Sequence, residues 1–82
     1  GYKMNTEQVI REAASRSGNS LRSVSSSMGK SANYIGSTLN QGSTPKADTL
    51  ASMLEPCGYS LAAIPKEDLP NSALVIDPAS KE

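Results

Sequence analysis

The side chains of this 82-residue chain that could do chemistry are hydroxyls, amides and one thiol, because the sequence has no histidine and a single cysteine, Cys57. A serine nucleophile needs a neighbouring base, and no histidine is present to serve as one. No pair of carboxylates sits on a recognisable cleft, and the shortage of Cys and His disfavours a zinc site. Cys57 is expected to be a small buried residue near a helix end. We therefore expect no enzyme and no cofactor, only binding through hydrogen bonds and charge.

The most informative segment of the chain is residues 20–42, SLRSVSSSMGKSANYIGSTLNQG. The pattern predicts a helix capped by Ser20 or Asn19 and a second helix capped by Ser31 that runs to about Asn40. A tight turn at residues 28–31 joins them, with Gly29 at the position that needs a positive φ. Two short helices joined in this way are typical of a helix-turn-helix, whose second helix lies in the DNA major groove. The apolar residues at helical spacing are Leu21, Val24, Met28, Tyr34, Ile35 and Leu39.

The stretch from Ser20 to Pro65 resembles the lambda-repressor-like helix-turn-helix domains of the Cro and Xre class, transcriptional regulators of phages and bacteria. The departures are Ser25 where alanine is usual, a spread Asn-Gln-Gly at 40–42, and Pro-Cys-Gly-Tyr at 56–59 in place of Leu-Gly-Tyr. The resemblance implies a mainly α fold of four to five helices, to which the sequence adds a short C-terminal β-hairpin. It is carried by Leu21, Val24, Ser25, Gly29, Ser31, Tyr34, Ile35, Leu39, Asn40, Pro45, Asp48, Thr49, Leu50, Gly58, Tyr59 and Pro65.

The resemblance also implies which side chains read bases. By position, Ala32, Asn33 and Ser37 correspond to the base-facing sites of the family. Asn33 is the best candidate because its amide can bond N6 and N7 of adenine together, whereas Ala32 suits a thymine methyl and Ser37 discriminates weakly. The alternative for Asn33 is a solvated residue at a helix start. Because this helix lacks an Arg or Gln at its start, we expect few strong base contacts.

Phosphate contacts are expected from helix N-termini and from small or basic donors beside them. For Arg22 and Lys46, an ordinary solvated charge is an equally open alternative. Tyr34 either reaches a phosphate with its hydroxyl or fills the core, and we favour packing. The candidate phosphate-binding residues are Arg22, Lys30, Ser31, Tyr34, Asn40 and Lys46.

Charge is divided unevenly along the chain although the formal net charge is zero. Residues 1–46 carry six basic and two acidic side chains, a net charge of +4, and residues 47–82 carry two basic and six acidic ones, a net charge of −4. This asymmetry indicates one face for phosphates and another for a different partner. A chance distribution of a few charges is the alternative.

The elements that must position this segment flank it on both sides. Asn5 predicts the start of a first helix, with Gln8 completing a capping box and Gly18 ending the helix. Met4 and Val9 are placed as a hydrophobic staple. A fourth helix should end near Glu55, because Pro56 cannot continue it. Its inward-facing residues are expected to be Ala47, Leu50, Ala51 and Leu54, with Met53 at the edge.

The last third of the chain changes character. The apolar runs 59–64 and 73–76 predict two strands of a hairpin with a long loop. An isolated hairpin is marginal in water, so these strands must pack on the helices or pair with another chain. The predicted organisation is a remnant of an expression tag at 1–3 before Met4, a helix-turn-helix DNA-binding domain at 4–58, C-terminal strands and possible dimerisation element at 59–77, and a frayed tail at 78–82.

Together these features predict a cytoplasmic, sequence-specific DNA-binding regulator, a repressor that binds a palindromic operator as a homodimer. A domain of this size buries a thin core, which favours dimerisation. The alternative is a protein-interaction module of the same fold, such as an antitoxin or phage accessory protein, whose acidic second half binds a protein partner. No apolar run is long enough to span a bilayer and no signal peptide is visible, so no membrane partner is expected.

Overall fold

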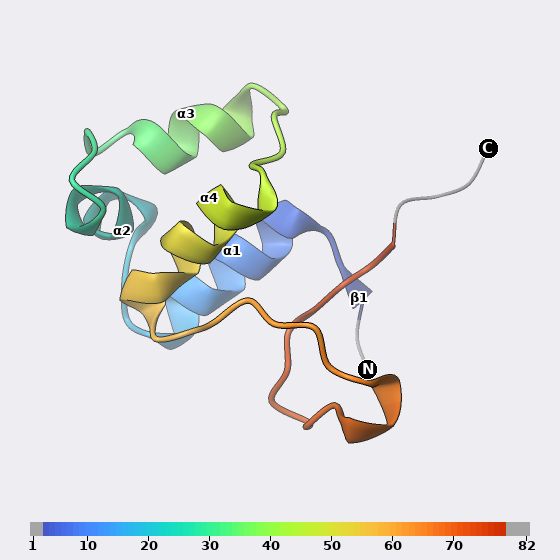
Figure 1. Ribbon diagram of the computed structural model, residues 1–82. Helices are drawn as coiled ribbons and strands as arrows, with labels where there is room; N and C mark the ends of the chain where they lie inside the picture. The colour runs from blue at the N-terminus through green and yellow to red at the C-terminus, as the bar shows by residue number, and fades with distance from the viewer. Residues whose placement is uncertain (1–2, 79–82) are drawn as a thin grey trace.

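Residues 3–78, the part of the chain that this computed structural model describes, contain four α-helices (Figure 1). They are α1 (Thr6–Arg16), α2 (Leu21–Ser27), α3 (Tyr34–Asn40) and α4 (Ala47–Leu54). Two 3-10 helices, η1 (Glu55–Cys57) and η2 (Lys66–Asp68), and two short strands, β1 (Lys3–Met4) and β2 (Val75–Ile76), complete the described structure. The prediction of a mainly α domain is confirmed. None of these helices has the length and apolar character needed to cross a membrane.

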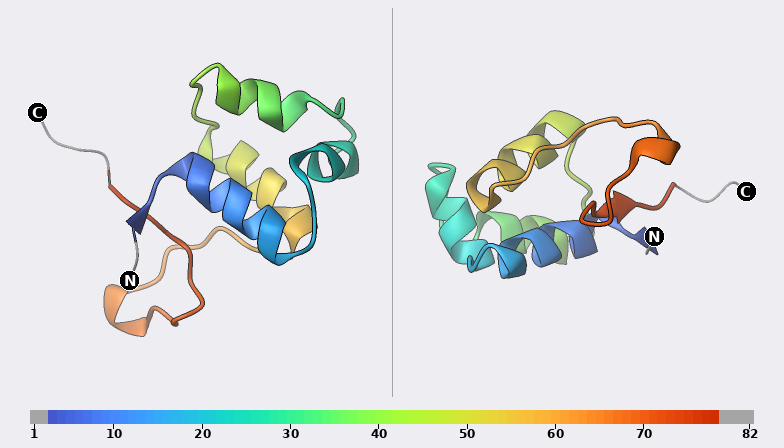
Figure 2. Two further views of the ribbon diagram at one scale, coloured as in Figure 1. Left: turned by 180° about the vertical axis from the view of Figure 1, so that it is seen from behind. Right: turned by 90° about the horizontal axis from the view of Figure 1, so that it is seen from below.

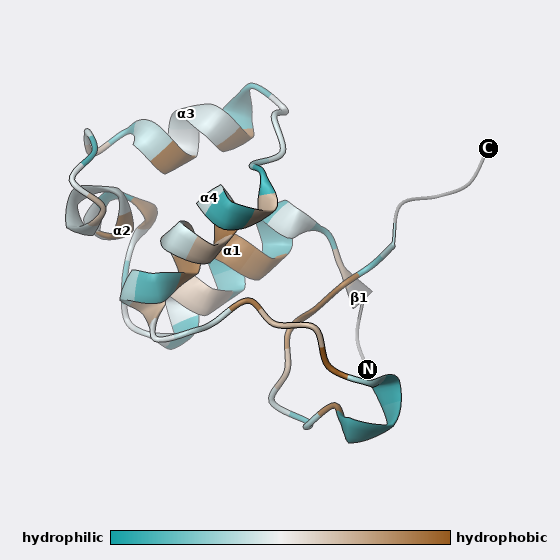
Figure 3. Ribbon diagram, in the orientation of Figure 1, coloured by the Kyte–Doolittle hydropathy of each residue, from teal (hydrophilic) through white to brown (hydrophobic). Residues whose placement is uncertain are grey.

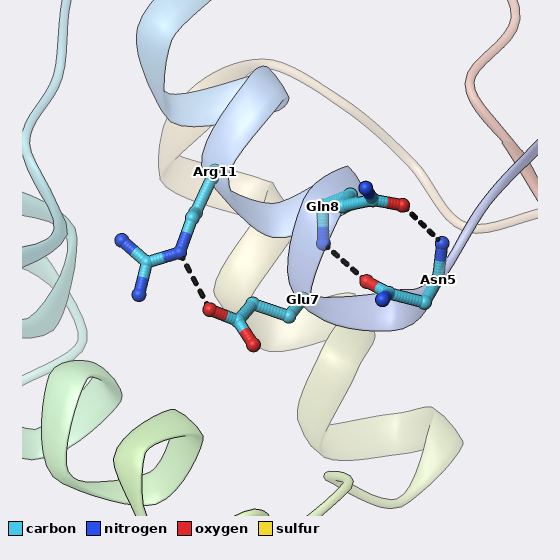
Figure 4. A network of polar contacts seen from close by, with 4 residues as sticks. All are labelled: Asn5, Glu7, Gln8 and Arg11. Atoms are coloured by element: carbon cyan, nitrogen blue, oxygen red, sulfur yellow. Dashed lines mark hydrogen bonds and ion pairs between the residues drawn. The ribbon is translucent and has the colours of Figure 1, made fainter.

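Helix α1 begins at a capping box, as predicted. The backbone N–H of Gln8 donates to Asn5 Oδ1, and the Asn5 N–H donates to Gln8 Oε1, both at 2.8 Å (Figure 4). These two bonds satisfy donors that have no partner within the helix. Met4 and Val9 are both buried in the core, where the predicted staple requires them. The start of α1 is therefore fixed by side chains local in sequence.

The core lies where the apolar sides of the four helices meet (Figure 3). The buried residues that α4 and η1 contribute follow the i, i+3, i+4, i+7 spacing of Leu50, Met53, Leu54 and Cys57. The prediction for Met53 was wrong, because its side chain is 0% exposed and belongs to the centre of that stripe. The prediction for Ala47 was also wrong, since this first residue of α4 is exposed and the core begins one turn later. The buried apolar residues are Met4, Val9, Ile10, Ala13, Ala14, Val24, Ile35, Leu39, Leu50, Met53, Leu54 and Cys57.

The end of α4 agrees with the prediction from Pro56. The α-helix stops at Leu54, and Pro56 lies inside η1, where a tighter turn replaces the α-helical one. Gly58 then takes a left-handed φ of 78°, and the Tyr59 N–H donates to the carbonyl of Leu54 at 3.1 Å. This bond turns the chain back across the helices, so that Tyr59 packs against the core.

The predicted C-terminal hairpin is wrong. Residues 59–64 form no strand, and β2 pairs in parallel with β1, with Lys3 opposite Val75 and Met4 opposite Ile76. Leu74 and Ile76 pack against the core beside α1, so the second apolar run finds its partners in the N-terminal part of the same chain. Residues 60–64 are exposed and pair with no strand, so their strand propensity alone does not produce a strand.

The boundaries predicted at the two ends fall partly outside the described structure. Of the segment 1–3, only Lys3 is described, and its backbone belongs to β1. Of the segment 78–82, residues 79–82 lie outside the described residues. Segment 59–77 forms an extended stretch that runs from the end of α4 to η2 and β2, and these two elements lie at the end of the molecule away from α2 (Figures 1 and 2).

Candidate nucleic-acid interface

Helices α2 and α3 pack against each other at one end of the molecule (Figure 2). Gly29 ends α2 with a φ of 77°, and the N–H of Lys30 donates to the carbonyl of Ser25 at 3.1 Å. A residue with a side chain would be strained at this φ, so the prediction of a turn at Gly29 is confirmed. The turn reverses the chain tightly enough for α3 to lie against α2.

The start of α3 differs from the prediction. Ser31 does not cap the helix, because α3 begins at Tyr34 and Asn33 occupies the N-cap position. The carbonyl of Ser31 accepts the Tyr34 N–H at 3.1 Å, so Ala32 and Asn33 form a turn that precedes the helix. Asn33 makes no side-chain capping bond. Its side chain is therefore available for other partners.

Arg22 is the partner that Asn33 finds. Nη1 of Arg22 donates to Oδ1 of Asn33 at 3.1 Å, across eleven residues of sequence and between two exposed side chains. Within the described residues, no hydrogen bond engages the amide nitrogen of Asn33. The bond joins a predicted phosphate-binding residue to the predicted base-reading residue, a connection that the sequence alone did not reveal.

The other predicted base-reading residues lie on the same short stretch. The carbonyl of Asn33 accepts the Ser37 N–H at 2.8 Å, which places Ser37 one helical turn further along α3. Asn33 and Ser37 are exposed, whereas Ala32 is half-buried. The two polar side chains therefore follow each other on the exposed side of α3, while Ile35 and Leu39 face the core.

Lys30 and Tyr34 form a second contact at this corner. Nζ of Lys30 lies 5.4 Å from the centre of the Tyr34 ring, within the range of a cation–π interaction. The Tyr34 ring is half-buried against the core, in agreement with the favoured packing role. The contact holds the Lys30 charge near the start of α3.

Three further predicted phosphate-binding residues are exposed but are not tied to this corner. Ser31 lies in the turn, Asn40 is the last residue of α3, and Lys46 precedes α4 as its N-cap residue. In the described part of the chain, no hydrogen bond or ion pair links their side chains to Arg22 or Asn33. Lys46 has an extended backbone and no side-chain capping bond.

Ion pairs on α1 engage two of the basic side chains of the first half of the chain. Arg11 pairs with Glu7 and Arg16 with Glu12, each at 2.8 Å between Nε and a carboxylate oxygen. Two hydrogen bonds, the larger effect from Glu12 and the smaller from Tyr59, raise the pKa of the exposed Arg16. Between Met4 and Lys46, no carboxylate is left to compensate Arg22, Lys30 and Lys46. These three side chains are exposed and form no ion pair among the described residues.

Ser25 links α2 to α3 in a way that the sequence predicted only in part. The sequence indicated a small residue where two helices approach, and Ser25 is 0% exposed. Its hydroxyl also donates to the carbonyl of Leu21 at 2.7 Å and accepts the N–H of Ile35 at 3.1 Å. The departure from alanine at this position was the available signal.

The side chains that commonly bind metals do not cluster in the described residues. No group of three or more His, Cys, Asp or Glu side chains lies together between residues 3 and 78. Cys57 is buried, as predicted, and its thiol lies 3.7 Å from the carbonyl of Met53. The arrangement can bind through hydrogen bonds and positive charge.

Searches with protein-family models, curated proteins and solved structures find no match to this chain, so its candidate interface is judged on its own residues.

Proposed function

We propose that this chain is a sequence-specific DNA-binding regulator, a repressor of the lambda-repressor-like helix-turn-helix type, with α3 in the major groove. The observation that carries the proposal is the Arg22–Asn33 hydrogen bond on the exposed corner of α2 and α3. Arg22 uses one acceptor position of Asn33 Oδ1, which leaves a second acceptor position and both amide hydrogens. Those are the groups that a bidentate contact with adenine N6 and N7 requires.

The uncompensated cations supply the phosphate contacts in this proposal. Arg22 has further N–H donors beyond the one that it gives to Asn33, and Lys30 and Lys46 extend the positive surface. Three phosphate contacts per protomer predict a slope of log affinity against log salt of about −2.7 per protomer, or about −5 for a dimer. Ser31 and Asn40 add neutral donors that contribute position more than charge.

In this proposal two copies of the chain bind a palindromic operator. Half-sites one helical turn apart require the two copies of α3 to lie roughly 34 Å from each other. We place the dimer contact in the later part of segment 59–77, because η2 and β2 lie at the end of the molecule away from α2 (Figure 2). Asn33 and Ser37 are exposed and stay free for DNA in that arrangement.

The direct test is selection of bound sequences from a random duplex pool at low salt. We expect a palindromic site to be enriched, with adenine in each half-site at a position that Asn33→Ala no longer selects. Asn71→Ala makes the same change at an exposed position in the tail and should leave the selected sequence intact. Failure of any sequence to be enriched, with duplex affinity no better than that of a neutral protein, would refute the DNA-binding proposal.

The second candidate function, a protein-interaction module, is favoured by one specific feature. Leu61, Ile64 and Leu69 are 40%, 43% and 38% exposed, which makes them the large exposed apolar residues of the described chain. Apolar residues gathered in one segment mark a surface that a protein can cover. Light scattering separates the two uses. A dimer that Leu61→Ser and Ile64→Ser convert to a monomer assigns the surface to self-association, whereas a monomeric wild type leaves it open to another protein.

A further inference from the structure

The N–H of Ile35 is a buried donor whose partner comes from another helix. The first N–H groups of an α-helix have no acceptor within the helix. Ile35 is the second residue of α3 and is 0% exposed, so water does not replace the missing acceptor. The residue in the N-cap position, Asn33, makes no capping bond. Ser25 of α2 supplies the acceptor instead, with its Oγ 3.1 Å from the Ile35 nitrogen.

The Ser25 hydroxyl is oriented for this role. It donates its proton to the carbonyl of Leu21 at 2.7 Å, which turns the oxygen lone pairs toward Ile35. In an α-helix the Leu21 carbonyl also accepts the N–H four residues later, so it keeps a partner if the hydroxyl is removed. Removing the hydroxyl therefore leaves one group without a partner, the Ile35 N–H.

We propose that Ser25 is a positioning residue, which caps α3 from α2 and thereby sets the orientation in which α3 presents Asn33 and Ser37. The inference rests on the proposed function and names what controls its sequence readout. The capped N–H is two residues after Asn33, so a shift at Ile35 moves the Asn33 side chain directly. Phosphate contacts from Lys30 and Lys46 lie outside α3 and are insensitive to such a shift.

A matched pair of variants tests the proposal. Ser25→Ala removes the hydroxyl at the helix contact, and Ser27→Ala makes the same change at an exposed position in the same helix. Two quantities are measured at a temperature where each variant is fully folded. They are the hydrogen-exchange rate of the Ile35 amide, and the ratio of affinities for the selected operator and for a duplex of unrelated sequence.

We expect Ser25→Ala to speed Ile35 exchange and to lower the specific-to-nonspecific ratio about tenfold per half-site, which corresponds to about 1.4 kcal/mol. Nonspecific affinity should stay unchanged, and Ser27→Ala should alter neither quantity. A merely structural role would lower both affinities together or neither. Either of those results, or an unchanged ratio, overturns the proposal.

Measurement of the wild-type protein keeps the proposal testable if Ser25→Ala does not fold. The Ile35 amide should exchange far more slowly than the uncapped Glu7 amide at the start of α1. Equal rates overturn the proposal. Failure of the proposed function would give a different result. Ser25→Ala would still speed hydrogen exchange at the Ile35 amide, but the wild-type protein would show no sequence preference for DNA.

Discussion

The Arg22–Asn33 contact leads to a double-mutant prediction. Both side chains are exposed, so the single bond of 3.1 Å between them adds little to the stability of the free protein. We expect Arg22→Ala, Asn33→Ala and the double variant to unfold within about 0.5 kcal/mol of the wild type. Any large change in DNA binding then reflects the interface itself.

The expected magnitudes follow from the role of each residue. Asn33→Ala should remove the proposed bidentate base contact, worth about 1–3 kcal/mol per half-site, hence about 2–6 kcal/mol for a dimer. Arg22→Ala should remove the proposed phosphate contact and make the salt slope shallower by about 0.9 per protomer, which Asn33→Ala should not do. If the Arg22–Asn33 bond orients Asn33, the two losses should overlap by about 0.5–1 kcal/mol per half-site.

The assay is a fluorescence anisotropy titration of each variant on the selected operator and on an operator with the contacted adenine replaced. It is run at two or more salt concentrations. Arg11→Ala removes an arginine that is paired with Glu7 on α1, so it controls for loss of charge alone. Losses that add within about 0.3 kcal/mol would refute the orienting role of Arg22. Equal weakening by Asn33→Ala on every sequence would refute its base contact.

Further outcomes concern the scaffold and the tail. Met53→Ala should lower the free energy of unfolding in chemical denaturation by about 2–5 kcal/mol, because the Met53 side chain is 0% exposed. Ser52→Ala, at an exposed position, is the control, and equal unfolding free energies for the two variants would contradict this packing. Gly29→Ala should cost about 1–2 kcal/mol in the same measurement, since φ is 77°; no loss would show that the turn relaxes. Leu61→Ser with Ile64→Ser should weaken self-association in light scattering without lowering the melting temperature, and an unchanged dimer would place the contact on the helices.

The elements around the candidate interface were predictable where the signal is local. The Asn5–Gln8 capping box and the turn at Gly29 depend on residues no more than five positions apart, and the structure contains both. The first turn of α3 was not predictable in this way. Ser31 has the right chemistry for a cap, yet the chain makes an extra turn through Ala32 and Asn33 before the helix begins.

The burial errors on α4 also have a physical cause. Met53 and Ala47 share the apolar spacing of the helix, and spacing alone does not show where neighbouring elements begin and end. The core covers α4 from Leu50 to Leu54, so Met53 is enclosed while Ala47 projects beyond it. Burial of a helix end depends on tertiary neighbours that a helical pattern does not contain.

The amino-acid sequence by itself determined where most helices start and stop, because capping, positive φ and i to i+4 spacing act within a few residues. Only the tertiary structure decided which distant groups meet. It paired Val75 with Lys3 from the opposite end of the chain in place of a hairpin, turned Arg22 toward Asn33, and gave Ser25 a second role as the cap of α3. Each of these contacts depends on how whole helices pack, and a hydrogen bond between packed elements leaves no periodic trace in the sequence.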